Sequence, residues 1–236
     1  ITRWGDLHRV WDGVAAAEAA GIHPLKLNAV VTRGFNEDEV AELARLSNRF
    51  ANLLERSGIS KGDRVCALIG RVPELYVSVL GTLKAGAVFC PLFSAFGPEP
   101  VRIRLAKSRA RILVTTASLY ERKVRTTRAD LPDLQQVLLV DGDGDEPDVG
   151  SFHAHLMAES DHRPPPRTQP GDMALLHFTS GTTGTPKGAI HVHDAVAAHR
   201  LTGRWVLDLR PGDIYWCTAD PGWVTGVSYG IIAPLA

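Results

Sequence analysis

Residues 64–91, RVCALIGRVPELYVSVLGTLKAGAVFCP, carry the alternation that decides the fold. Short apolar runs at 64–69 and 87–91 predict two buried strands. The segment between them, 73–84, predicts a helix with proline in its first turn, where a missing N–H is tolerated. Two apolar strands joined by a helix of about three turns are typical of a βαβ unit, whose strands are parallel.

The same alternation continues on both sides of this unit. Upstream, the sequence predicts a helix over 36–57 that begins with a capping box. Downstream, it predicts a helix over 98–108 and strands over 111–115, 136–140 and 173–178. The sequence therefore predicts an α/β protein with layered, mainly parallel sheets flanked by helices.

One region, 141–171, is expected to form a loop or linker within this pattern. Residues 141–145 resemble the start of a calcium loop, but Glu146 stands where that loop needs glycine and Phe152 where it needs glutamate. A solvated acidic turn is therefore predicted there. Residues 160–171 contain Pro164-Pro165-Pro166 and Pro170, which predict a stiff linker or surface loop.

The composition is that of an ordinary globular protein, with 44% hydrophobic and 22% charged residues. The 26 basic and 26 acidic residues cancel, so charge gives no indication of a nucleic-acid partner. The three cysteines, Cys66, Cys90 and Cys217, are too widely spaced for a zinc ribbon or a disulfide framework. With no apolar run long enough to span a bilayer, we expect a cytoplasmic enzyme domain that acts on small molecules. The oligomeric state is not indicated.

The stretch 179–188, TSGTTGTPKG, is the strongest candidate for chemistry. Gly181 and Gly184 permit positive φ, so that backbone N–H groups can turn inward, while hydroxyls and Lys187 add donors and a positive charge. Placed between a strand and a helix, as we expect here, such a nest suits the oxygens of a polyphosphate. The common P-loop is excluded because Thr185-Pro186 separates the last glycine of that pattern from the lysine. A flexible surface loop is the alternative.

This stretch resembles the ATP-phosphate loop of the adenylate-forming (AMP-binding) family, which includes acyl-CoA synthetases, luciferases and the adenylation domains of peptide synthetases. The resemblance implies ATP, Mg²⁺ and CoA as substrates or cofactors. It also implies catalytic roles for Lys187 and Thr183. By the same resemblance, the β- and γ-phosphates would be held by Thr179, Ser180, Gly181, Thr182, Thr183, Gly184 and Lys187.

A second stretch, 213–226 (DIYWCTADPGWVTG), resembles the acetyl-CoA synthetase branch of that family. The resemblance implies that Trp223, Val224 and Thr225 form a small acyl pocket, while Trp216 is expected in the core. The implied reaction joins an acid, ATP and CoA into acyl-CoA, AMP and pyrophosphate, with acetate as the acid. Two alternatives stay open: a ligase for another short-chain or aryl acid, and a non-catalytic ATP-binding fragment.

His191 and His193 follow the loop and could form a metal pair. No third ligand lies at the spacing of a zinc protease, and histidines at a helix start are more often structural. We therefore predict no metal ligands in the protein.

The first residues differ from the rest. Residues 1–42, with a helix expected at 6–20 and a strand at 26–31, resemble the radical-SAM GTP cyclase of molybdenum-cofactor synthesis. The cluster of that enzyme cannot form here, because the first 65 residues contain no cysteine. We therefore expect a structural passenger at 1–42 and a partial adenylation domain at 43–236. Such a chimeric fragment, lacking the family's C-terminal catalytic parts, is expected to turn over little substrate by itself.

Overall fold

The computed structural model describes residues 37–179, 185–210, 213, 215 and 217–236. The expected helix at 6–20, the strand at 26–31 and most of the 1–42 segment lie outside the described residues. So do Trp216 and residues 180–184. In the described part of the chain, no helix is long and apolar enough to cross a membrane.

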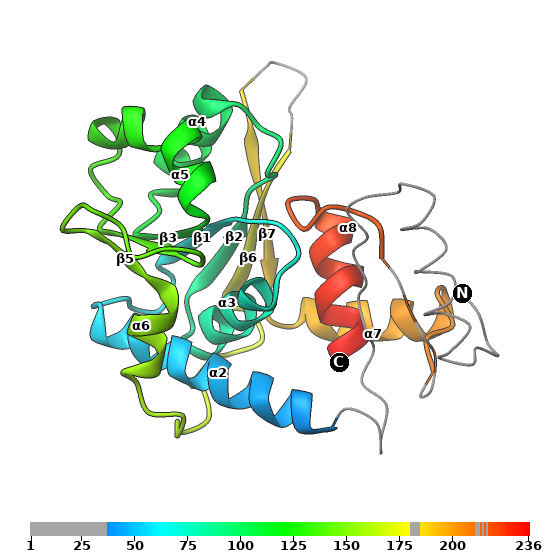
Figure 1. Ribbon diagram of the computed structural model, residues 1–236. Coiled ribbons are helices and arrows are strands. Elements are labelled where there is room, and N and C mark those ends of the chain that lie inside the picture. The colour runs from blue at the N-terminus through cyan, green and yellow to red at the C-terminus, as the bar shows by residue number, and fades with distance from the viewer. Residues whose placement is uncertain (1–36, 180–184, 211–212, 214, 216) are drawn as a thin grey trace, which may run out of the picture.

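One seven-stranded sheet forms the centre of the molecule (Figure 1). Its order is β5-β4-β3-β1-β2-β6-β7, and every neighbouring pair is parallel except β6 and β7. The predicted mainly parallel α/β fold is therefore confirmed. The strands are β1 (Arg64–Leu68), β2 (Val88–Pro91), β3 (Ile112–Thr115), β4 (Gln136–Leu139), β5 (Val149–Ser151), β6 (Met173–Thr179) and β7 (Lys187–Val192).

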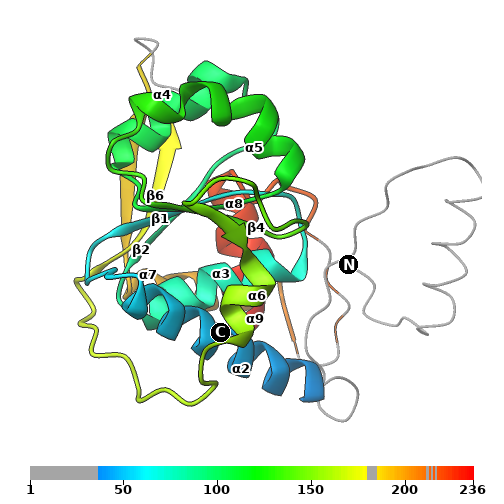
Figure 2. The same ribbon diagram turned by 60° about the vertical axis from the view of Figure 1, so that its left-hand side comes forward.

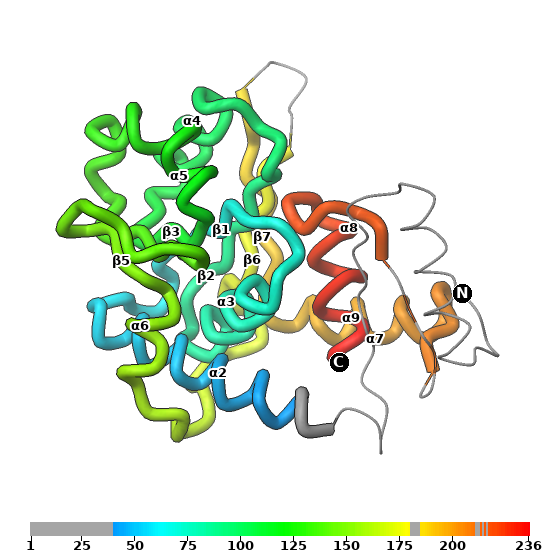
Figure 3. The backbone as a smooth tube through the Cα atoms, viewed as in Figure 1, coloured from blue at the N-terminus to red at the C-terminus, as the bar shows by residue number. Residues whose placement is uncertain are grey.

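Helices cover both faces of the sheet (Figure 2). One face carries α2 (Glu37–Arg56), α3 (Pro73–Lys84) and α6 (Phe152–Met157), and the other carries α4 (Pro98–Ser108), α5 (Ala117–Lys123) and the 3₁₀ turn η1 (Arg125–Asp130). The chain then adds α7 (Ala195–Trp205), α8 (Val224–Val227), the π-helical η2 (Ser228–Ile232) and α9 (Ala233–Leu235). The last three follow one another as a continuous helical rod that packs against α7 (Figure 3).

Two apolar cores follow from the alternation of strand side chains. On one face, Phe50, Phe89 and Phe152 are fully buried with side chains from α2, α3 and α6. On the other face, Cys66, Leu105 and their neighbours pack beneath α4 and α5. Because both faces are covered, β1, β2 and β3 are almost continuously apolar, as the sequence indicates.

The elements predicted between 36 and 140 agree with the structure within a few residues, but α5, β5, α6 and β7 were not predicted. The loop region expected at 141–171 contains β5 and α6, and only its last part, 160–171, is a loop throughout; this loop is fastened to α2. Asn48 donates to the Asp161 carbonyl at 2.9 Å, and Arg163 donates to the Asn52 Oδ1 atom at 2.7 Å.

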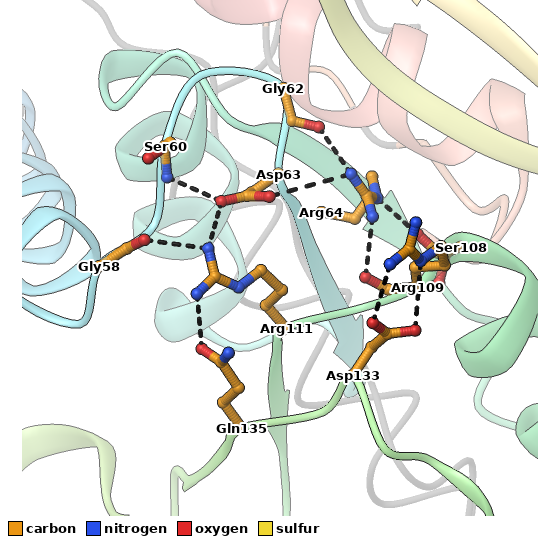
Figure 4. A network of polar contacts seen from close by, with 10 residues as sticks. All are labelled: Gly58, Ser60, Gly62, Asp63, Arg64, Ser108, Arg109, Arg111, Asp133 and Gln135. Carbon is orange, nitrogen blue, oxygen red and sulfur yellow. Dashed lines mark hydrogen bonds and ion pairs between the residues drawn. The ribbon is translucent and has the colours of Figure 1, made fainter.

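A polar network closes the amino-terminal edge of the sheet (Figure 4). The Arg111 guanidinium donates to the Gly58 carbonyl at 2.9 Å, to Asp63 Oδ2 at 2.6 Å and to Gln135 Oε1 at 2.8 Å. Burial opposes ionisation of Asp63. The Ser60 N–H and Arg111 outweigh that effect and hold the pKa of Asp63 below its usual range. Arg111 thus ties together the segments that precede β1 and β4.

We expect Arg111→Ala to lower the free energy of unfolding by about 1–3 kcal/mol, because it leaves a partly buried carboxylate without its nearer cation, with only Arg64 at 4.0 Å. Arg109→Ala is the matched control from the same network: Arg109 is exposed and pairs with Asp133 at 3.3 Å. Removing the Arg109 side chain should lower the free energy of unfolding by less than about 0.5 kcal/mol. Urea unfolding of both variants measures the difference; equal losses would contradict the role given to Arg111.

Candidate functional site

The two strands that flank the glycine-rich stretch in the chain form an antiparallel hairpin. Strands β6 and β7 pair along their length, and Thr179 lies opposite Lys187 in the register. The Thr179 hydroxyl donates to the Lys187 carbonyl at 3.4 Å. The structure therefore brings these two predicted phosphate-binding residues together. It describes nothing of Ser180, Gly181, Thr182, Thr183 or Gly184.

The expectation that this stretch leads into a helix was wrong. Residues Lys187–Val192 form strand β7, and the next helix, α7, begins only at Ala195. Antiparallel pairing with β6 supplies the hydrogen bonds that a helix would otherwise have supplied. The described residues that follow the glycine-rich stretch, Lys187–Val192, therefore offer no helix N-terminus to a phosphate. In the described residues of the hairpin tip, the positive charge comes from Lys187.

The end of the loop is anchored from a neighbouring helix. Pro186 is buried, and its carbonyl accepts a hydrogen bond from Lys107 Nζ of α4 at 3.2 Å. Lys187 itself is exposed, and no ion pair joins it to another residue in the described part of the chain. Its ammonium group is therefore available to a ligand at the tip of the hairpin.

The second candidate stretch, Asp220 to Gly226, forms a tight turn at the start of α8. The Gly222 N–H donates to Asp220 Oδ1 at 2.7 Å, and the Trp223 N–H donates to the Asp220 carbonyl at 3.0 Å. A Cβ atom on Gly226 would lie 2.0 Å from that carbonyl oxygen. The turn therefore requires glycine at 226, and it presents Trp223, Val224 and Thr225 on an exposed edge.

This turn rests on the carboxyl end of strand β2. A Cβ atom on Gly222 would lie 2.3 Å from the Phe93 Cα atom, so the two backbones are in contact. The Trp223 indole is 45% exposed and lies 5.3 Å from the Phe93 ring and 6.5 Å from the Phe96 ring, between centroids. Ligands of open parallel sheets bind beyond the carboxyl ends of the strands, which is where these aromatic rings lie.

Histidines line the contact between the hairpin and the C-terminal helices. The rings of His177, His191 and His199 follow one another at 5.3 and 5.7 Å, and Tyr229 lies 6.0 Å from His199. His177 is 1% exposed, and neither of its ring nitrogens has a hydrogen-bond partner among the described residues. Burial, together with repulsion from His191 and His199, lowers the pKa of His177 to about 4.

His193 lies beside Asp172 rather than in this row. Its backbone N–H donates to the Asp172 carbonyl at 3.0 Å, and burial lowers the pKa of its ring. Within residues 37–179 and the described positions after them, no three His, Cys, Asp or Glu side chains are grouped so as to hold a metal ion.

Acid should destabilise the chain through His177. Its pKa is lower in the folded state than the value of about 6.5 expected when unfolded, so the unfolded state takes up the proton first. The stability contribution is present above pH 6.5 and is lost as the pH falls toward 4, by up to about 3 kcal/mol. We expect His177→Leu to flatten this part of the stability–pH curve, measured by urea unfolding. The exposed His153, changed to Gln, is the control; an equal flattening there would contradict the assignment.

In the structure, the predicted site residues that are described lie in two separate groups. Thr179 and Lys187 share the hairpin tip, while Trp223, Val224 and Thr225 share the turn at α8. Among the described residues, no hydrogen bond, ion pair or ring contact joins the two groups. Lys107 and the contact of Phe93 and Phe96 with Trp223 were not predicted, because residues this far apart in the chain leave no periodic signal. The role of Asp220 in the turn was not predicted either, although Asp220 lies only two residues before Gly222.

Comparison with known proteins identifies a family. The sequence profile described as AMP-binding enzyme matches residues 20–236. Acetyl-coenzyme A synthetase of Bacillus subtilis is 47% identical over 195 residues, covering 82% of this chain and 34% of the relative. Acetyl-coenzyme A synthetase 2 of Pseudomonas aeruginosa is 34% identical over 227 residues, covering 88% and 35%.

Solved structures show the same fold. An acyl-CoA synthetase of Brucella canis superposes with a TM-score of 0.73 at 34% identity, covering 83% of this chain and 35% of that one. An anthranilate CoA ligase, solved in complex with anthranoyl-AMP, superposes with a TM-score of 0.77 at 26% identity, covering 82% and 37%.

The chain belongs to the AMP-binding enzyme family, the adenylate-forming ligases. Within that family it is similar to acetyl-coenzyme A synthetases, and it spans about a third of the length of the curated relatives it matches. The profile match begins at residue 20 and so includes part of the 1–42 segment. A foreign origin for that segment stays a prediction.

Proposed function

We propose that this chain supplies the phosphate-binding loop and the acid-selecting turn of an acetate–CoA ligase. The observation that carries the proposal is the turn at Asp220–Gly226, which presents Trp223, Val224 and Thr225 beside the carboxyl end of β2. The 47% identity to an acetyl-coenzyme A synthetase supports acetate as the acid.

The reaction divides into two steps. The acetate carboxylate attacks the α-phosphorus of ATP and releases pyrophosphate, and the CoA thiol then attacks the carbonyl of the mixed anhydride and releases AMP. Thr179 and Lys187 would hold the β- and γ-phosphates together with Ser180, Gly181, Thr182, Thr183 and Gly184. Lys187 and Thr183 would stabilise the charge that develops on the departing pyrophosphate.

Magnesium would share this neutralisation of phosphate charge. The described residues contain no cluster of carboxylates or histidines that could hold the ion alone. The ion would therefore arrive with the phosphate oxygens of ATP, which are ligands that Mg²⁺ prefers. CoA is the second substrate of the proposed reaction, and no contact with it is assigned.

The acid is selected by size. A bulky indole at Trp223, flanked by Val224 and Thr225, leaves room for a short chain only. A single extra methylene in such a pocket changes kcat/KM by about 10–200-fold. We therefore expect acetate to be preferred over propionate, and both over benzoate.

The test is ATP–pyrophosphate exchange with acetate, propionate and benzoate in the longest natural polypeptide that contains this chain. A preference for benzoate would contradict the pocket and favour an aryl ligase, the second candidate. That candidate has a specific observation behind it, since an anthranilate CoA ligase shares the fold with a TM-score of 0.77. A polypeptide that binds ATP but supports no exchange with any acid would favour the non-catalytic alternative.

A further inference from the structure

Two phenylalanines at the end of β2 hold the indole that the proposed function places in the acid pocket. Residues Phe93, Ser94, Ala95 and Phe96 form a turn, called here the Phe93–Phe96 turn, in which the Phe96 N–H donates to the Phe93 carbonyl at 3.1 Å. The two rings meet edge to face at 5.3 Å and 87°. Both rings then face Trp223, at 5.3 and 6.5 Å.

The Phe93–Phe96 turn is itself fixed from two helices. Lys123 Nζ of α5 donates to the Ser94 carbonyl at 2.6 Å and to the Phe96 carbonyl at 2.7 Å. The Arg104 guanidinium of α4 lies 4.0 Å from the centre of the Phe96 ring, and Arg104 is itself buried. A cation over an aromatic face restricts the motion of that ring. The turn is therefore a rigid support rather than a mobile surface loop.

Trp223 needs such a support. It is 45% exposed and stands at the N-cap of the four-residue helix α8, so its own helix leaves the indole rotation largely free. The backbone contact of Gly222 with Phe93 fixes the base of the side chain, and the aromatic rings then limit the indole from one side. Aromatic pairs at these separations prefer tilted and edge-to-face arrangements, which are directional.

We propose that the Phe93–Phe96 turn determines acid selectivity indirectly, by positioning the Trp223 indole. This inference rests on the proposed function, because it assigns a new role within the same acid pocket. Phe93 and Phe96 act as positioning residues. When either ring is trimmed, the indole gains freedom to move away from the pocket, and acids longer than acetate are admitted.

The test compares kcat/KM for acetate and butyrate in the longest natural polypeptide that contains this chain. We expect Phe93→Leu to reduce the acetate-to-butyrate ratio about tenfold, mainly through a lower KM for butyrate, with kcat for acetate nearly unchanged. Phe96→Leu should act in the same direction. Both rings are only half-buried, so a leucine is accommodated and at least one variant should fold.

Phe152→Leu is the matched control. Phe152 stacks on Phe50 at 5.4 Å in the core on the other face of the sheet, so this variant trims an aromatic pair without touching Trp223. We expect the acetate-to-butyrate ratio of kcat/KM in Phe152→Leu to stay within twofold of the ratio in the unmutated polypeptide. An equal change in ratio for Phe152→Leu would show a general loss of rigidity and overturn the inference.

A second readout follows the indole directly. In protein labelled with 5-fluorotryptophan, the Trp223 resonance is assigned through Trp223→Phe. Phe93→Leu should shift and broaden that resonance, and Phe152→Leu should not. An unchanged acetate-to-butyrate ratio in Phe93→Leu and Phe96→Leu, from a polypeptide that activates acetate, overturns this inference alone. If the unmutated polypeptide activates no acid, the proposed function and the inference both fail.

Discussion

Gly226→Ala should lower the free energy of unfolding by about 3–5 kcal/mol, among the largest effects of any single substitution. Gly226 lies within α8, where helix propensity alone favours alanine by about 1 kcal/mol. The added Cβ atom would lie 2.0 Å from the Asp220 carbonyl oxygen and 2.5 Å from its carbonyl carbon. Backbone atoms cannot move aside as a flexible side chain can, so the steric cost exceeds the propensity gain.

Gly171→Ala provides the control for this substitution. Apart from its two neighbours in the chain, no described residue has an atom within 4 Å of the position that its Cβ would occupy. We expect Gly171→Ala to change the free energy of unfolding by no more than about 0.5 kcal/mol. Urea unfolding followed by tryptophan fluorescence measures both variants. A stabilised Gly226→Ala would mean that propensity outweighs the contact, and the tight turn described for Asp220–Gly226 would then be wrong.

Lys187→Ala should reduce ATP–pyrophosphate exchange about a hundredfold or more. Removing one preorganised group that stabilises transition-state charge typically costs a hundredfold to a thousandfold in rate. Lys187 is exposed at the hairpin tip opposite Thr179, so alanine there removes a charge without leaving a cavity. The free energy of unfolding should therefore change little, and the loss should appear in the rate of ATP–pyrophosphate exchange.

Lys61→Ala tests whether any lysine would give this result. Lys61 is half exposed and pairs with Asp172 at 2.6 Å, close to the amino-terminal edge of the sheet. Exchange in this variant should stay within twofold of the unmutated rate. Near-normal exchange in Lys187→Ala would remove Lys187 from the phosphate site.

The sequence predicted the centre of the fold well because its strands are buried on both faces. Val65, Cys66 and Phe89 lie in apolar runs bounded by glycine or proline, which is a strong strand signal. Strand β5 has only three residues, one of them glycine, and its pairing with β4 leaves no pattern in the sequence. Strands with an almost continuous apolar run were predicted even when they have four residues, as β3 has, whereas elements without such a run were missed.

The site shows a different limit. The stretch 179–188 indicated the family, yet its residues suggested a helix where β7 forms, because the strand is set by its pairing with β6 and not by the residues of β7 alone. The support of Trp223 by Phe93 is likewise non-local. It depends on a backbone contact between Gly222 and Phe93, which are joined only in the folded chain. The residue types in these stretches indicated the chemistry, whereas the contacts that hold the site residues in place are visible only in the tertiary structure.

Transfer of an acetate oxygen to AMP tests the central claim most directly. Acetate labelled with heavy oxygen is incubated with ATP, Mg²⁺, CoA and the longest natural polypeptide that contains this chain, and the AMP is analysed by mass spectrometry. If the carboxylate attacks the α-phosphorus, AMP retains a single labelled oxygen when the thiol displaces it. Unlabelled AMP alongside newly formed acetyl-CoA, or no AMP at all, would contradict the account.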